Sequence, residues 1–389
     1  MNHPIQDNTD PASPPRPAWT PARAETPAVG PTAPGGPTAP VPTPPRLAWG
    51  EDQGPLQTVS VWTERVPGRG EDAEPFIAHH WESRQGMLAV FDGSGGSGAA
   101  PAWQAPDRTS RTSAWVGART ARLATECWLH DVTRERQDVE AQSLHAYLTY
   151  FLHKAPQRHS KIGGTMRRQL PTTFAGVHYQ IVAGDAEVEL RLLWAGDSRA
   201  YALLPESGLH VLTRDHTRES DALELLRSDP PMTNLVCADR DFDIDTHRLA
   251  LRLPCVLVAA TDGFFGYVHT PADFELLVLR TLQQAGGAAE WAHLLRREVE
   301  AFTADDASLA LLTLGYPDFD DLRSRFTPRL KQLTDQQYRD RPSALTAAAG
   351  PAADPHETAA QVKAWQDQSW QAYRHDYESH LPPAPEELV

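Results

Sequence analysis

The chain has 389 residues and a formal net charge of −15, because 51 aspartates and glutamates outnumber 36 lysines and arginines. This length allows a single large mixed-sheet domain, and the acidic excess excludes a broad nucleic-acid-binding surface, which needs clustered cations. The 3 cysteines are widely spaced, which excludes a disulfide framework and a cysteine-rich zinc site. We expect a cytoplasmic monomer that binds no membrane, because the sequence shows neither a secretory signal nor an apolar run of membrane-spanning length.

The N-terminal segment is rich in proline. Residues 1–46 hold 14 of the chain's 34 prolines, together with alanine, threonine and glycine. Such a segment cannot bury enough apolar surface to offset the entropy lost on ordering, so we predict an extended, disordered tail over residues 1–48. Its composition is compatible with a plain spacer and with a ligand for a proline-binding module.

Short apolar runs predict strands beyond this tail, and apolar repeats of helical period predict helices. In chain order, strands are expected at 59–62, 76–78, 87–91, 174–182, 188–195, 200–204, 249–260 and 309–314. Helices are expected at 113–130, 141–153, 221–226, 272–284 and 288–302. Groups of strands separated by paired helices favour an α+β fold, with helices on both faces of mainly antiparallel sheets. We assign this domain to residues 49–316.

Residues 317–389 are predicted to form a polar, helical C-terminal extension, with a break rich in proline, alanine and glycine at 342–355. The last helix places its large apolar side chains on one face, since they recur every three to five residues. These side chains are Val362, Trp365, Trp370, Tyr373, Tyr377 and Leu381. We expect the stripe to pack on its own domain, and a partner-binding helix is the alternative.

Carboxylates follow or precede apolar strands throughout the central region. Asp92 ends the run 87–91 and Asp262 follows the run 256–260, each with a glycine after it. Asp197 follows the run 192–195, and an acidic pair introduces the run 309–314. Mg²⁺ and Mn²⁺ prefer carboxylate, carbonyl and water ligands, and glycine lets a backbone carbonyl approach a cation closely. The pattern therefore predicts one oxygen-lined cation site.

Seven short motifs, in this order over residues 55–315, resemble the PPM-type metal-dependent protein serine/threonine phosphatases, also called the type 2C family, in a bacterial-like form. The motifs are Glu71-Asp72-Ala73, Asp92-Gly93-x-Gly95-Gly96, Pro171-Thr172-Thr173, Gly196-Asp197-Ser198-Arg199, Leu212-Thr213-x-Asp215-His216, Thr261-Asp262-Gly263 and Asp305-Asp306-Ala307-Ser308. The resemblance implies that family's α-β-β-α sandwich, in which two sheets pack together and the metal site opens at one edge.

The resemblance also implies a set of metal ligands. Asp92 resembles the carboxylate that bridges two Mn²⁺ or Mg²⁺ ions, and the Gly93 carbonyl completes one coordination shell. Asp262 and Asp305 resemble the other direct ligands, and Asp197 resembles a residue that helps to form a third, weaker metal site. Two such ions would activate a water and neutralise the phosphoryl oxygens, so no phosphoenzyme intermediate is required.

Glu71 and Asp72 resemble the acidic pair that holds metal-bound waters and orients the nucleophilic one, so both are expected to be catalytic and Asp72 also to serve the metals. The family's phosphate-binding arginine has no counterpart at Pro67, but Arg65 and Arg69 flank that position and are the candidates for phosphate capture. Ser94 stands where some members carry a histidine that serves as general acid.

The resemblance implies metal-dependent hydrolysis of phosphoserine and phosphothreonine in proteins, opposing a serine/threonine kinase. Asp306 replaces the family's usual asparagine. Ser94, Pro67 and the displaced arginines motivate an alternative in which the chain is a weak or inactive phosphatase-fold module that binds phosphoproteins and regulates them. A hydrolase of small phosphate esters would use the same site and differ only at its rim.

Overall fold

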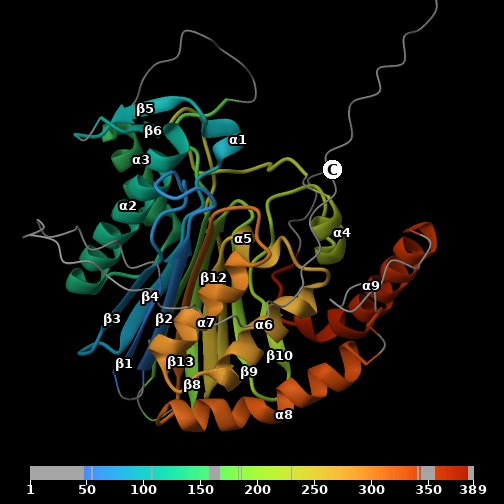
Figure 1. Ribbon diagram of the computed structural model, residues 1–389. Helices are drawn as coiled ribbons and strands as arrows, with labels where there is room; N and C mark the ends of the chain where they lie inside the picture. Colours follow the sequence, from blue (N-terminus) through green and yellow to red (C-terminus); the bar gives the residue numbers. More distant parts are fainter. Residues whose placement is uncertain are drawn as a thin grey trace, which may run out of the picture.

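The computed structural model describes residues 48–383 apart from 54–55, 107, 157–166, 183, 185, 229, 340 and 343–354. Of the tail predicted over residues 1–48, only the last residue falls within this range. Two antiparallel sheets lie face to face, with helices on both outer faces (Figure 1). The predicted α+β sandwich is therefore confirmed. The three cysteines are free thiols, and no helix in the described ranges has the length and apolar character of a membrane span.

Both large sheets have every neighbouring pair antiparallel. The six-stranded sheet has the order β1 (Ala48–Gln53), β2 (Leu56–Thr63), β13 (Ala307–Leu314), β12 (Cys255–Ala260), β9 (Arg199–Leu204) and β10 (Gly208–Val211). The five-stranded sheet has the order β11 (Asp245–Arg252), β8 (Glu187–Ala195), β7 (Phe174–Ile181), β4 (Gln85–Val90) and β3 (Phe76–His80). A small hairpin joins β5 (Pro101–Gln104) to β6 (Ser110–Thr112).

The prediction of a single strand at 249–260 is wrong. The chain turns at Leu253 and Pro254, so that β11 pairs with β8 in one sheet and β12 pairs with β9 and β13 in the other. Proline lacks the N–H that a central strand would donate, which explains why the apolar run divides there. The remaining predicted strands are present, with ends shifted by a few residues.

The helices divide between the two outer faces (Figure 1). Apolar side chains of α2 (Ser113–Glu135) and α3 (Ala141–Lys154) form one buried cluster with the five-stranded sheet. Helices α6 (Pro271–Gln284), α7 (Ala288–Glu300) and α8 (Phe319–Gln337) form another with the six-stranded sheet. A third cluster, including Leu88, Val177 and Leu257, fills the space between the sheets. Short helices are α1 (Gly95–Gly98), α4 (Ala222–Arg227) and α5 (Asp262–Phe265).

The C-terminal helix α9 (Pro355–Tyr377) packs on the body of its own chain. Trp370, Tyr373 and Tyr377 belong to the same cluster as α6 and the six-stranded sheet, and Tyr377 lies 6.3 Å from Tyr201 of β9 between ring centroids. The indole N–H of Trp365 donates to the Gln337 carbonyl at the end of α8 (3.2 Å). The aromatic stripe is therefore intramolecular, as expected, and the partner-binding alternative does not hold for these buried side chains.

Candidate active site

Carboxylates from both sheets meet at one end of the sandwich. Asp92 follows β4, Asp262 begins α5 directly after β12, and Asp305 precedes β13. Asp197 occupies the turn between β8 and β9, and Asp72 lies in the loop between β2 and β3. These strand ends meet at the same end of the sandwich, because β12 lies between β9 and β13 in one sheet and β4 of the other sheet packs against β12 and β13.

Three of these carboxylates line one cleft of about 100 Å³, which we call the acidic cleft. Asp197, Asp262 and Asp305 contribute to it, together with Tyr267, whose hydroxyl lies 3.5 Å from Asp305 Oδ2. Gly196 has a φ of +97°, a conformation that glycine adopts at no steric cost and that turns the chain sharply ahead of Asp197. The cleft therefore has an acidic floor built from segments far apart in the sequence.

Burial and mutual repulsion raise the pKa of the acidic side chains. Burial is the largest cause at Asp92, and the charges of Asp72, Asp262, Asp197 and Asp305 add to it. The pKa of Asp72, which is 2% exposed, rises for the same two reasons. Burial and then the Asp262 charge raise the pKa of Asp197. Each carboxylate disfavours ionisation of its neighbours, and the charges of Arg199 near Asp197 and of Arg65 near Asp305 offset this only in part.

The donor chemistry of this group fits a divalent cation. Asp197 Oδ1 is buried and has no hydrogen-bond partner among the residues that the structure describes, which is costly for a carboxylate oxygen unless a cation or donor satisfies it. Carboxylate oxygens are also the ligands that Mg²⁺ and Mn²⁺ prefer. Among the described residues, however, no three His, Cys, Asp or Glu side chains stand in an arrangement that would hold an ion. The carboxylates share one electrostatic environment without forming a closed coordination shell.

Contacts from several elements hold the side chains of the acidic pair Glu71 and Asp72. Thr261 Oγ1 donates to Asp72 Oδ2 (3.1 Å). Thr112, the N-cap of α2, accepts from the backbone N–H of Trp115 and donates its own proton to Glu71 Oε1. Burial raises the pKa of Glu71, and this hydrogen bond from Thr112 lowers it. The start of α2 thereby fixes the Glu71 carboxylate beside the cleft.

Asp306 connects the acidic pair to the candidate phosphate-binding arginines. Its Oδ2 accepts from the Glu71 N–H (2.6 Å) and its Oδ1 from the Arg65 N–H (2.8 Å). The side chains of Arg65 and Arg69 are both exposed on this loop. An asparagine at 306 could accept only one of these bonds through its oxygen, so the aspartate accounts for the loop geometry.

Arg119 of α2 was not identified from the sequence. Its Nη1 donates to the Glu71 carbonyl (3.1 Å), and its guanidinium lies 4.1 Å from the ring centroid of Trp115. Burial lowers the pKa of Arg119 to about 10, and the Asp72 charge opposes that shift. The spacing of Trp115 and Arg119, one helical turn apart, was the available signal. Arg119 therefore stabilises the loop that carries Glu71 and Asp72 through this backbone contact.

The motifs around Arg199 and His216 also meet at this end. Arg199 donates from Nε and Nη2 to the two carboxylate oxygens of Asp215 (2.8 and 2.7 Å), and both side chains are buried beside the acidic cleft. The Gly196 N–H donates to His216 Nδ1 (2.9 Å), so the ring proton lies on Nε2, which contacts Asp245 (3.0 Å). Both contacts hold the turn that carries Asp197.

Searches of family models and of curated proteins return no match to this chain. Among solved structures, it is similar to the serine/threonine phosphatase PstP/Ppp of Mycobacterium tuberculosis (16% identity, TM-score 0.44, 67% of this chain and 99% of that one). It is also similar to a phosphatase of Toxoplasma gondii (13%, TM-score 0.49, 69% and 95%). The catalytic domain of PstP with 2 manganese ions is a further match (17%, TM-score 0.42, 67% and 98%).

These likenesses are of overall fold alone, and the fold assignment rests on the strand pairing described above. The two antiparallel sheets and their flanking helices are the architecture that the sequence motifs imply. The chain therefore has an α-β-β-α fold.

Proposed function

We propose that this protein hydrolyses phosphoserine and phosphothreonine in proteins, using a water activated by Mn²⁺ or Mg²⁺. The observation that carries the proposal is the gathering of five mutually repelling carboxylates at one end of the sandwich. A bound divalent cation would relieve that repulsion, and its charge would lower the pKa of a bound water and polarise a phosphoryl group. We assign the catalytic domain to residues 49–316, acting as a cytoplasmic monomer that opposes a serine/threonine kinase.

Two ions, with a third at lower affinity, would be held by oxygens of this chain. The residues that would hold them are Asp92, Gly93 through its carbonyl, Asp262, Asp305, Asp72 and Asp197. Asp92, Asp262 and Asp305 would hold the two principal ions, and Asp197 the third. These side chains bind a cation in their ionised form. Because the pKa values of Asp92 and Asp305 are raised, cation binding would be accompanied by release of protons from them.

The side chains around the metal ligands would bind the substrate and move the proton. Glu71 and Asp72 would accept hydrogen bonds from the attacking water and so orient it. Arg65 and Arg69 are exposed on the adjacent loop and would bind the phosphate oxygens by charge-assisted hydrogen bonds. Ser94 contacts Ser97 Oγ (2.9 Å), so the leaving alkoxide would take its proton from solvent.

A regulatory module that binds phosphoproteins without turnover is the second candidate. It is favoured by the open arrangement of the carboxylates, because no three His, Cys, Asp or Glu side chains of the described ranges are arranged to hold a metal ion. The two candidates differ in whether bound phosphopeptide is consumed.

Turnover of a phosphothreonine peptide separates these candidates. We expect phosphate release with Mn²⁺ and none with a chelator, and we expect Asp262→Asn to reduce kcat by about 10²-fold or more, since the metal supplies several kcal/mol of transition-state stabilisation. The matched control is Asp335→Asn on the exposed side of α8. Peptide binding without metal-dependent release would support the regulatory module, and release only from p-nitrophenyl phosphate would indicate a small-ester hydrolase.

Adjacent glycines after Asp92 provide a second test of the site. A methyl group at Gly95 would collide with Glu71 Oε2, whereas one at Gly96 would meet open space. Gly95→Ala is therefore expected to displace the Glu71 carboxylate and to lower kcat/KM for the peptide by about 10²-fold, the cost of a misplacement near 1 Å. Gly96→Ala, with the same change in helix propensity, should leave kcat/KM within twofold. Equal effects of both variants would show that Glu71 has no catalytic part.

A further inference from the structure

One wall of the acidic cleft is formed by the short helix α4 and the residues after it. Leu225, Leu226 and Ser228 line the cleft together with Asp197 and Asp262. A polypeptide whose phosphate bound in this cleft would therefore lie beside this wall. A helix of 6 residues has too few internal hydrogen bonds to be stable alone. The position of the wall must therefore depend on what holds α4.

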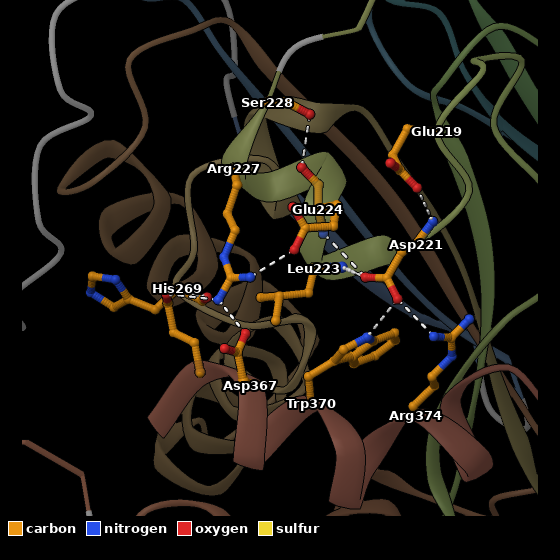
Figure 2. Close-up of polar contacts among 11 residues, drawn as sticks. Glu219, Asp221, Leu223, Glu224, Arg227, Ser228, His269, Asp367, Trp370 and Arg374 are labelled. Atoms are coloured by element: carbon orange, nitrogen blue, oxygen red, sulfur yellow. Dashed lines mark hydrogen bonds and ion pairs between the residues drawn. The ribbon is translucent and has the colours of Figure 1, made fainter. Parts of the chain in front are cut away.

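Asp221 connects the N-terminus of α4 to α9, with one carboxylate oxygen bound to each helix (Figure 2). Oδ1 caps the helix by accepting from the backbone N–H groups of Leu223 (2.9 Å) and Glu224 (3.2 Å). Oδ2 accepts from Trp370 Nε1 (3.1 Å) and Arg374 Nη1 (2.7 Å), both on α9. One carboxylate thus serves two separable tasks, and its contacts with α9 can be removed while the cap stays intact.

The C-terminus of α4 makes a second contact with α9. Arg227 Nη2 donates to Asp367 (2.6 Å), and Arg227 Nη1 to Glu224 within α4 (2.7 Å). Gln366 lies 3.4 Å from Arg227 and donates to the His269 carbonyl at the start of α6 (2.9 Å). Figure 2 shows the side chains of Arg227 on α4 and Asp367 on α9 pointing toward one another. Both ends of the short helix are therefore attached to the same long one.

Helix α9 is anchored independently of α4. The Tyr373 hydroxyl donates to the buried Glu275 of α6 (2.6 Å), and Tyr377 packs on Tyr201 of the six-stranded sheet. Both tyrosine side chains are buried in the core cluster of that sheet. The anchor therefore remains when the polar contacts to α4 are cut.

We propose that α9 is a positioning element of the active site, which holds α4 in place and so sets how a phosphorylated polypeptide enters the acidic cleft. The proposal deepens the proposed function and rests on it for the nature of the substrate. The mechanical part, that α9 holds α4, stands on the contacts alone. Breaking those contacts should loosen the wall and impair polypeptide binding, while the carboxylates at the cleft floor remain unchanged.

The mechanical part is tested by hydrogen exchange on the full chain. In the double variant Asp367→Asn, Arg374→Gln, the amides of residues 222–228 are expected to exchange about tenfold faster, because the two ion pairs between α4 and α9 are lost while the neutral hydrogen bond from Trp370 remains. Asp376→Asn is the matched control, since it makes the same change at an exposed carboxylate of α9. Unchanged protection of α4 in the double variant, or an equal loss in Asp376→Asn, would overturn the proposal.

The functional part is tested by comparing two substrates with Mn²⁺ present. The double variant is expected to raise KM for a phosphothreonine peptide about tenfold, with kcat for p-nitrophenyl phosphate within twofold of the wild type. Replacing Arg374 by lysine instead of glutamine in the Asp367→Asn background should bring KM for the peptide most of the way back to the wild-type value, because a charged donor returns to Asp221. A parallel fall of kcat for both substrates would refute the positioning role. A wild type inactive on both would refute the proposed function and leave the exchange result standing.

Discussion

Asp92→Asn is expected to abolish Mn²⁺-dependent turnover and at the same time to stabilise the metal-free protein. Asp92 is surrounded by Asp72, Asp262, Asp197 and Asp305, whose charges raise its pKa together with burial. An amide removes one charge from this group, so its neighbours ionise with less repulsion. We expect a gain of about 1 kcal/mol, or roughly 2–4 °C in Tm for a domain of this size, as for other substitutions that relieve strain at a functional site.

The pH dependence of Tm separates this repulsion from other effects. A carboxylate whose pKa is raised in the folded state binds more protons there than in the unfolded chain, so its stabilising contribution is full below the unfolded pKa and is lost as pH rises through the folded pKa. Metal-free wild type should therefore lose more stability than Asp92→Asn as pH rises from 4 to 8. The Tm of Asp335→Asn should change with pH in parallel with that of the wild type. With saturating Mn²⁺, the wild type should have a higher Tm than Asp92→Asn.

Arg329→Met is expected to produce the largest loss of stability among single substitutions outside the site. Arg329 of α8 is 4% exposed and donates to both oxygens of Glu275, which is fully buried (2.6 and 3.0 Å). Glu275 also accepts from the Tyr373 hydroxyl and the Leu209 N–H, so it joins α6, α8, α9 and β10. Removing the arginine leaves a buried charge without its counter-ion, which costs about 3–5 kcal/mol.

Chemical denaturation of two further variants tests this explanation. Arg325→Met makes the same change on the same helix, but at an exposed pair with Asp321, and should cost less than about 1 kcal/mol. Adding Glu275→Gln to Arg329→Met removes the stranded charge and keeps an acceptor for Tyr373, so more than half of the loss should be recovered. Additive losses in the double variant would contradict the assignment.

The sequence predicted the order of the elements because their period and apolar runs are local properties. It did not predict that the run 249–260 divides between two sheets, since either half could pair in either sheet until the whole fold is known. The carboxylates that meet at the cleft were each visible as acidic ends of apolar strands. Their supports were not, because Thr112 and Arg119 reach Glu71 across more than 40 residues. The pairing of Arg199 with Asp215 likewise depends on how two motifs pack.

The position of β13 has a consequence for how the chain matures. Among the strands of the described residues, β13 is the last to be synthesised, yet it lies between β2 and β12 and pairs with both along its length. Until it leaves the ribosome, the six-stranded sheet is divided into two parts, and Asp305 is absent from the cleft. Nascent chains shorter than about 314 residues therefore lack both the continuous six-stranded sheet and the complete acidic cleft.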